Sequence, residues 1–179
     1  MNIINFFSET KFARERKTFE SEKINSIFLN YSEIKSVLLL FDIKNDINIS
    51  IFEHLANILK ADQKKVVLCG FVAQKKSILK SDKNKIIIRK KDISLCQKPK
   101  KDLLNTISER QFDAAFLLST KKSIPTMYAL MNTDAKIKCG SISAFNLLDF
   151  IIDTSNIQFA DEVYIFDNII RYLKMINKN

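Results

Sequence analysis

Short, continuously apolar runs recur along this chain and alternate with helical patterns. Four of them are strong: 36–41 (SVLLLF), 65–71 (KVVLCGF), 85–89 (KIIIR) and 112–118 (FDAAFLL). Two weaker segments follow, a half-exposed one at 136–139 that Gly140 ends, and one at 150–153. Because a strand that is buried on both faces shows no polar alternation, these runs predict a mostly parallel sheet of five to six strands.

Most segments between the runs have helical periodicity, whereas 72–84 is lysine-rich and polar. The helix between the first two runs carries its apolar residues on one stripe: Ile51, Phe52, Leu55, Ile58 and Leu59. Pro99 and Pro125 suit the first positions of two shorter helices, and residues 160–178 form a terminal amphipathic helix. Strands that alternate with helices pair in parallel through right-handed crossovers. Residues 31–179 are therefore predicted to form a single three-layer, Rossmann-like α/β domain.

Residues 1–30 are expected to form a charged helical segment in front of this domain. The helical pattern covers 8–28, and Ser8 is placed to cap its start. The apolar stripe of this helix is thin, mainly Phe12 and Phe19, which predicts a helix on the surface of the fold. Such a helix is suited to docking a protein partner. The sequence leaves the oligomeric state open.

The scarce residue types exclude several kinds of chemistry. The chain has two glycines, one histidine and three cysteines. These cannot build a glycine-rich phosphate loop, a two-histidine metal motif or a four-thiolate zinc site. We therefore expect no cofactor and no metal. The single histidine, His54, lies on a helix flank without a catalytic arrangement around it, which favours a non-catalytic role.

The expected location is the cytoplasm. No basic region followed by an apolar stretch marks a secretory signal. The apolar runs are far shorter than the ~20 residues that a membrane-spanning helix needs. Cys69, Cys96 and Cys139 are widely spaced, which fits free thiols in a reducing compartment.

The formal net charge of +9 is concentrated in one segment, 75–101. This segment holds 11 of the 29 basic residues and 2 of the 20 acidic ones, so the rest of the chain is balanced at 18 of each. Its basic residues are Lys75, Lys76, Lys80, Lys83, Lys85, Arg89, Lys90, Lys91, Lys98, Lys100 and Lys101. Cations that surround one strand form a patch that binds phosphates without reading base sequence. RNA, including ribosomal RNA, is the expected partner.

Two alternatives account for the same lysines. Lysines protect an edge strand against pairing with other chains. A gene from an AT-rich genome also encodes abundant lysine, although codon bias predicts an evenly spread excess rather than a local one.

A second candidate site lies where strands end. Ligands of open α/β sheets bind beyond the carboxyl ends of the strands. The ligand-binding candidates there are Asp42, Ser119, Thr120, Ser123 and Asp153. Free N–H groups at the start of the helix after residue 118 favour an anion, whereas ordinary helix caps explain the same hydroxyls.

The order of the apolar segments also carries a family resemblance. The succession SVLLLF, KVVLCGFVAQKK (65–76) and FDAAFLLSTKKSIPTMYALMNTDAKIKCGS (112–141), with a terminal amphipathic helix, resembles an uncharacterised family of short bacterial α/β proteins. That resemblance implies a cytoplasmic bacterial domain and no site residues.

Residues 111–141 are also distantly similar to the N-terminal Rossmann half of heptosyltransferase-like glycosyltransferases. The shared pattern comprises Asp113, the strand 114–118, a helix with Tyr128 and a basic strand 136–140. Those enzymes bind the nucleotide sugar mainly with a second domain, for which this chain has no room. The similarity therefore implies a small ligand-binding protein or a degenerate enzyme.

Overall fold

The computed structural model describes residues 3–22, 29–46, 48–74, 76–141 and 147–176. Its elements in chain order are α1 (Ile3–Glu22), β1 (Ser36–Ile43), α2 (Ile49–Ala61), β2 (Lys65–Val72), β3 (Lys85–Arg89), the 3₁₀ turn η1 (Lys90–Asp92), α3 (Lys101–Ser108), β4 (Gln111–Leu117), α4 (Ile124–Met131), β5 (Asp134–Ser141), β6 (Phe150–Ile152) and α5 (Glu162–Met175). Each predicted strand is present.

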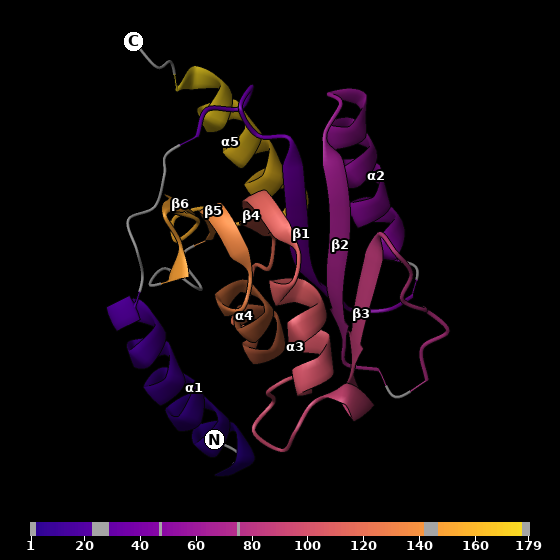
Figure 1. Cartoon of the computed structure of the whole chain (residues 1–179), viewed down its shortest axis with the longest axis vertical. Helices are drawn as coiled ribbons and strands as arrows, with labels where there is room; N and C mark the ends of the chain where they lie inside the picture. Colours follow the sequence, from indigo (N-terminus) through magenta and orange to yellow (C-terminus); the bar gives the residue numbers. More distant parts are fainter. Residues whose placement is uncertain (1–2, 23–28, 47, 75, 142–146, 177–179) are drawn as a thin grey trace.

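A single six-stranded sheet forms the centre, in the order β3-β2-β1-β4-β5-β6 (Figure 1). Every neighbouring pair is parallel. The chain moves outward from β1 to β3 on one side and from β4 to β6 on the other, so the strand order reverses between β1 and β4. The predicted Rossmann-like α/β fold with a parallel sheet is confirmed, and all strands end at the same edge, where such folds bind ligands.

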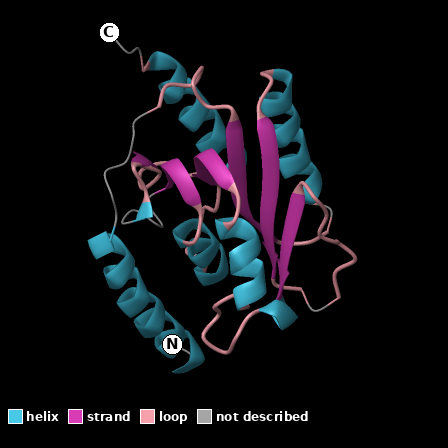
Figure 2. Ribbon diagram, in the orientation of Figure 1, coloured by secondary structure: helices cyan, strands magenta, loops and turns pink. Residues whose placement is uncertain are grey.

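Helices cover both faces of the sheet (Figures 1 and 2). α2 and α5 pack on one face, and α3 and α4 pack on the other. α1 lies outside α4 and contacts it. The α4 helix is consequently enclosed, and all eight of its residues are buried.

The side chains of β1 alternate between the two cores. Leu39 and Phe41 face α2 and α5, and the ring of Phe41 stacks on Phe52 with 3.7 Å between centroids. Leu38 and Leu40 join the core on the α3 and α4 side. Each fully buried Leu or Phe side chain stabilises the fold by ~1.5–3 kcal/mol. Burial on both faces explains why this run has no polar alternation.

Both glycines lie inside strands, Gly70 in β2 and Gly140 in β5. The prediction that Gly140 ends its strand is wrong, because β5 continues to Ser141. A Cβ on Gly70 would lie 2.6 Å from Cδ1 of Ile43 and 2.8 Å from Cε2 of Phe41. Gly70 therefore leaves space for the side chains of β1, and neither glycine forms a phosphate loop.

The N-terminal helix differs from the prediction at its start. α1 begins at Ile3, so Ser8 lies inside the helix and is buried instead of capping it. Phe12 is also buried, because its ring packs edge-on against Tyr128 of α4 with 5.0 Å between centroids. The predicted segment 23–28 and the side chain of Phe19 lie outside the described residues.

Three smaller expectations are corrected. α3 starts two residues after Pro99, which pairs with Ile93 across a loop instead of opening the helix. In α2, Ile51 and Ile58 are exposed, because the helix turns Phe52 and its neighbours on that face toward the sheet. β5 is half-exposed only at its start and is buried over its last five residues, since β6 pairs beyond it.

Candidate nucleic-acid interface

The lysine-rich segment surrounds the outer edge of the sheet. It begins in the loop after β2, continues through β3 and η1, and ends at the first residue of α3. β3 is the edge strand and pairs with β2, so the cations of the loop after β2, of β3 and of η1 gather at one edge, as predicted. The remaining three, Lys98, Lys100 and Lys101, lie apart from that edge, beside α1 and the start of α3. The connection from β2 to β3 is a loop without a helix in its described part, which leaves most of its side chains exposed.

Acidic partners pair with a minority of the cations. Within the described ranges the segment forms three Nζ–carboxylate ion pairs: Lys85–Glu53 at 2.6 Å, Lys98–Glu15 at 2.6 Å and Lys100–Asp92 at 4.0 Å. Six further lysines are exposed and have no acidic partner within the described ranges: Lys76, Lys80, Lys83, Lys90, Lys91 and Lys101. Lys75 lies outside the described residues. The segment therefore keeps most of its positive charge for an external anion.

A carboxylate on the neighbouring loop shapes the basic loop. Asp46, in the connection from β1 to α2, accepts hydrogen bonds from the Ile78 backbone N–H (2.9 Å) and the Ser77 hydroxyl (2.7 Å). These bonds lower the pKa of Asp46 below its ordinary value, with a smaller contribution from Arg89. The Arg89 guanidinium in turn donates to the Leu79 carbonyl. The loop after β2 is thus held in a defined shape.

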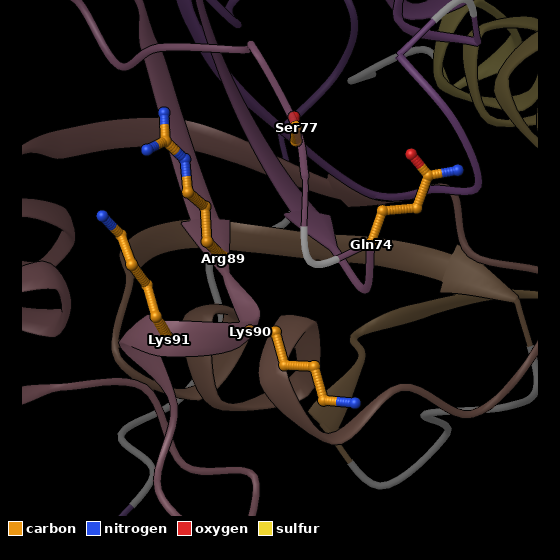
Figure 3. A pocket seen from close by; sticks show the side chains of 5 residues that line it. All are labelled: Gln74, Ser77, Arg89, Lys90 and Lys91. Atoms are coloured by element: carbon orange, nitrogen blue, oxygen red, sulfur yellow. The ribbon is translucent and has the colours of Figure 1, made fainter.

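A cavity of about 460 Å³ lies beyond the carboxyl ends of β2 and β3. Its lining residues are Gln74, Ser77, Arg89, Lys90 and Lys91 (Figure 3). Figure 3 shows these side chains coming from the loop after β2, from the end of β3 and from η1. Three of these five are cations, and none of the described lining residues is a carboxylate. In Figure 3 the side chains of Arg89 and Lys91 extend to the same side, whereas Lys90 extends in another direction. Arg89 and Lys91 are therefore the pair suited to a phosphate group, because cations donate charge-assisted hydrogen bonds to it.

Sequence reasoning found Arg89, Lys90 and Lys91 but missed Asp46 and Ser77. The Asp46–Ser77 bond joins residues 31 apart in the chain, and nothing local marks it. The available signal was their position: both follow neighbouring strands that end at the same sheet edge.

Part of the second candidate site also comes together. The Asp42 carboxylate accepts hydrogen bonds of 2.6 Å from the hydroxyls of both Ser119 and Ser123. The Ser141 hydroxyl donates to the Ser119 carbonyl over 2.8 Å. Burial raises the pKa of Asp42 above its ordinary value, although the two serine hydroxyls act in the opposite direction. This network joins the ends of β1, β4 and β5 at the point where the strand order reverses.

The other two candidates of that site lie apart from the network. Asp153 is exposed at the end of β6, where it accepts a hydrogen bond from the Ser155 N–H. Three strand spacings separate β6 from β1, about 14 Å at ~4.8 Å each. Thr120 is half-buried and is not among the partners of Asp42. The structure therefore brings together Asp42, Ser119 and Ser123 only.

Asp113, which contributes to the glycosyltransferase-like pattern, lies near the amino end of β4. The candidate ligand residues lie at the opposite ends of the strands. Its carboxylate accepts bonds from the backbone N–H groups of Lys35 and Ser36, from the Ser36 hydroxyl and from Lys136 Nζ. Burial raises its pKa, but these bonds outweigh that effect and lower the pKa to about 2. Asp113 anchors the start of β4 to the start of β1, away from the carboxyl ends of the strands.

Metal-ligating clusters and membrane-spanning helices are both absent from the described ranges. No group of three or more His, Cys, Asp or Glu side chains is placed to hold a metal ion there. No helix in those ranges is both long and apolar enough to cross a bilayer. The three cysteines are free thiols, of which Cys69 and Cys139 are buried.

The fold and this basic face define the class of protein: a parallel α/β domain with Rossmann strand order and a cationic edge around β3. A family model matches residues 5–176, and the chain belongs to that family, a family of unknown function (DUF6913). No curated protein and no solved structure matches the chain significantly.

Proposed function

We propose that this chain is a cytoplasmic, non-catalytic RNA-binding domain whose contact surface is the lysine-rich edge around β3. The observation that carries the proposal is the 460 Å³ cavity lined by Arg89, Lys90 and Lys91, set among exposed lysines that have no acidic partner in the described ranges. Free thiols at Cys69, Cys96 and Cys139 support a reducing compartment.

The extent of the charged surface favours a polymer over a single small anion. Its exposed lysines lie on three successive pieces of chain: the loop that precedes β3, the turn η1 and the start of α3. A polyphosphate backbone presents regularly spaced negative charges that several such lysines contact together, and their counterions are released on binding. Contacts to phosphate fix position without reading sequence.

The Asp42 network gives less support to the alternative of a small-ligand site. The hydroxyls of Ser119 and Ser123 already bind the carboxylate of Asp42, so these groups satisfy one another. The network is suited to holding the loop between β4 and α4 against the end of β1.

The test is RNA binding by the full chain as a function of salt. Fluorescence anisotropy of a labelled single-stranded 12-mer RNA compares wild type, K90E/K91E and the matched control K35E/K65E. Lys35 and Lys65 are exposed and lie at the amino ends of β1 and β2, so the control makes the same change in net charge elsewhere. We expect K90E/K91E to weaken binding at least tenfold and to lower the salt slope by about 1.4, at ~0.7 per phosphate contact.

Two outcomes would contradict the proposal. One is wild-type binding that does not depend on salt, which points to a protein or small-molecule partner. The other is an equal loss of affinity in both charge-reversed variants, because then net charge alone and not the β3 edge governs binding. Retained thermal stability of both variants checks that the fold is intact.

A further inference from the structure

A second cavity, of about 540 Å³, lies on the other side of η1, between α1 and the start of α3. Its volume falls within the roughly 300–1,000 Å³ of typical small-molecule sites. The chain from Arg89 to Lys101 runs from the first cavity to this one. The two cavities are therefore neighbours along the same basic segment.

Among the described residues, every charged side chain that lines this second cavity is a lysine: Lys11, Lys98, Lys100 and Lys101. Lys11 and Lys101 are exposed and have no acidic partner among the described residues. Lys98 is fixed in place by Glu15 of α1, with 2.6 Å between Nζ and Oε2. The lining thus provides two uncompensated cations and a positioned third.

An apolar floor distinguishes this cavity from the first. Ile93, Pro99 and Leu104 line it, and Pro99 and Leu104 are buried. Ile93 and Pro99 face each other across an antiparallel bridge, and Gln97 takes a left-handed conformation (φ 59°) in the turn between them. The Ser94 N–H donates to the Lys98 carbonyl over 2.8 Å. The floor is therefore formed before a ligand arrives.

Two side-chain amides, Asn105 and Asn132, complete the lining. The Asn132 Nδ2 group donates to the Tyr128 carbonyl over 2.8 Å, which orients its amide oxygen. An amide offers both a donor and an acceptor, the combination that pairs with the edges of nucleobases.

We propose that this cavity binds a single nucleotide unit, with the phosphate on the lysines and the base between the apolar floor and the two amides. A nucleotide within an RNA chain is the source that agrees with the RNA binding proposed above, on which this inference rests; a free mononucleotide has the same chemistry. Lys11 makes α1 a wall of the site, so the N-terminal helix contributes this one lysine to the RNA-binding surface.

The test uses the full chain, with adenosine and uridine monophosphate, inorganic phosphate and the 12-mer RNA as probes. NMR chemical shifts locate binding, and K11Q/K101Q is compared with the matched control K17Q/K121Q, whose lysines are exposed and do not line the cavity. We expect shifts at Ile93, Leu104 and Asn105 with mononucleotide. We also expect at least a tenfold weaker affinity for mononucleotide and RNA in K11Q/K101Q and unchanged affinity in the control.

The possible results separate this inference from the proposed function. RNA binding that is lost in K90E/K91E but unchanged in K11Q/K101Q would overturn the nucleotide site and leave the function standing. Mononucleotide binding without RNA binding would support the site and overturn the function. Equal affinity for inorganic phosphate and mononucleotide would overturn the assignment of a base-binding floor.

Discussion

The hydroxyl of Ser123 donates a 2.6 Å hydrogen bond to the carboxylate of Asp42. The bond joins the end of β1 to the loop that precedes α4, across the point where the strand order reverses. In dinucleotide-binding folds this position holds a glycine-rich turn that receives a pyrophosphate. Here a carboxylate and hydroxyls occupy it, and the cationic edge lies further out, at β3.

Replacing Asp42 tests how that network responds to pH. Burial raises the folded-state pKa of Asp42 above its ordinary 3.8, so the folded protein binds a proton more readily than the unfolded chain. The stability of wild type relative to D42N is therefore expected to rise as pH falls from 7 through the folded-state pKa, and to level off below 3.8. Urea unfolding of both proteins across this range measures it. A stability difference between wild type and D42N that does not change with pH would contradict the raised pKa of Asp42.

Asp113 gives the opposite pH dependence. Its folded-state pKa of about 2 lies below the ordinary 3.8, so its stabilisation is complete above pH 4 and is lost as pH falls toward 2. D113N should be less stable than wild type at pH 7 by on the order of 2 kcal/mol. The difference should shrink below pH 3 in urea titrations. An equal difference at pH 7 and pH 2.5 would show that the Asp113 carboxylate is not the stabilising group.

Gly70 provides a test of packing between β1 and β2. In G70A the new Cβ meets Cδ1 of Ile43 at 2.6 Å, and the crowding should destabilise the fold by ~1–3 kcal/mol. The variant I43V removes that Cδ1 atom, so G70A/I43V should recover part of the loss. Thermal denaturation of the four proteins gives the coupling energy. Purely additive effects would contradict the contact.

Phe12 tests the docking of α1 on α4. Its ring is buried against Tyr128, and removing a buried phenylalanine ring costs ~3–5 kcal/mol in a protein core. F12A should release α1, which hydrogen exchange detects as faster exchange in α1 with protection retained in β1. Phe7 is 61% exposed, so F7A is the matched control, expected to change stability by less than ~0.5 kcal/mol.

The sheet was predictable because burial on both faces leaves a local signature. The run from Val37 to Phe41 is apolar at every position, since alternate side chains enter two different cores. The position of α1 was not predictable from Ser8, because a capping pattern depends only on neighbouring residues. The contact of Phe12 with Tyr128, which holds this helix on α4, joins residues far apart in the chain.

One part of the candidate site was also predictable from the sequence, and another part was not. The lysines around β3 were visible as a charge excess along the chain, and their place at a sheet edge followed from the strand pattern. The bond from Ser77 to Asp46 and the contribution of Lys11 to the second cavity depend on tertiary packing. Neither periodicity nor composition predicts that bond or the contribution of Lys11.

The measurement that most directly tests the RNA-binding surface is the salt dependence of RNA affinity in wild type, K90E/K91E and K35E/K65E. Binding through the β3 edge predicts that the affinity of wild type falls steeply with salt. In K90E/K91E the salt slope should be smaller by about 1.4 and the binding at least tenfold weaker. The control should behave as wild type. Equal affinity and equal slope in all three proteins would contradict it.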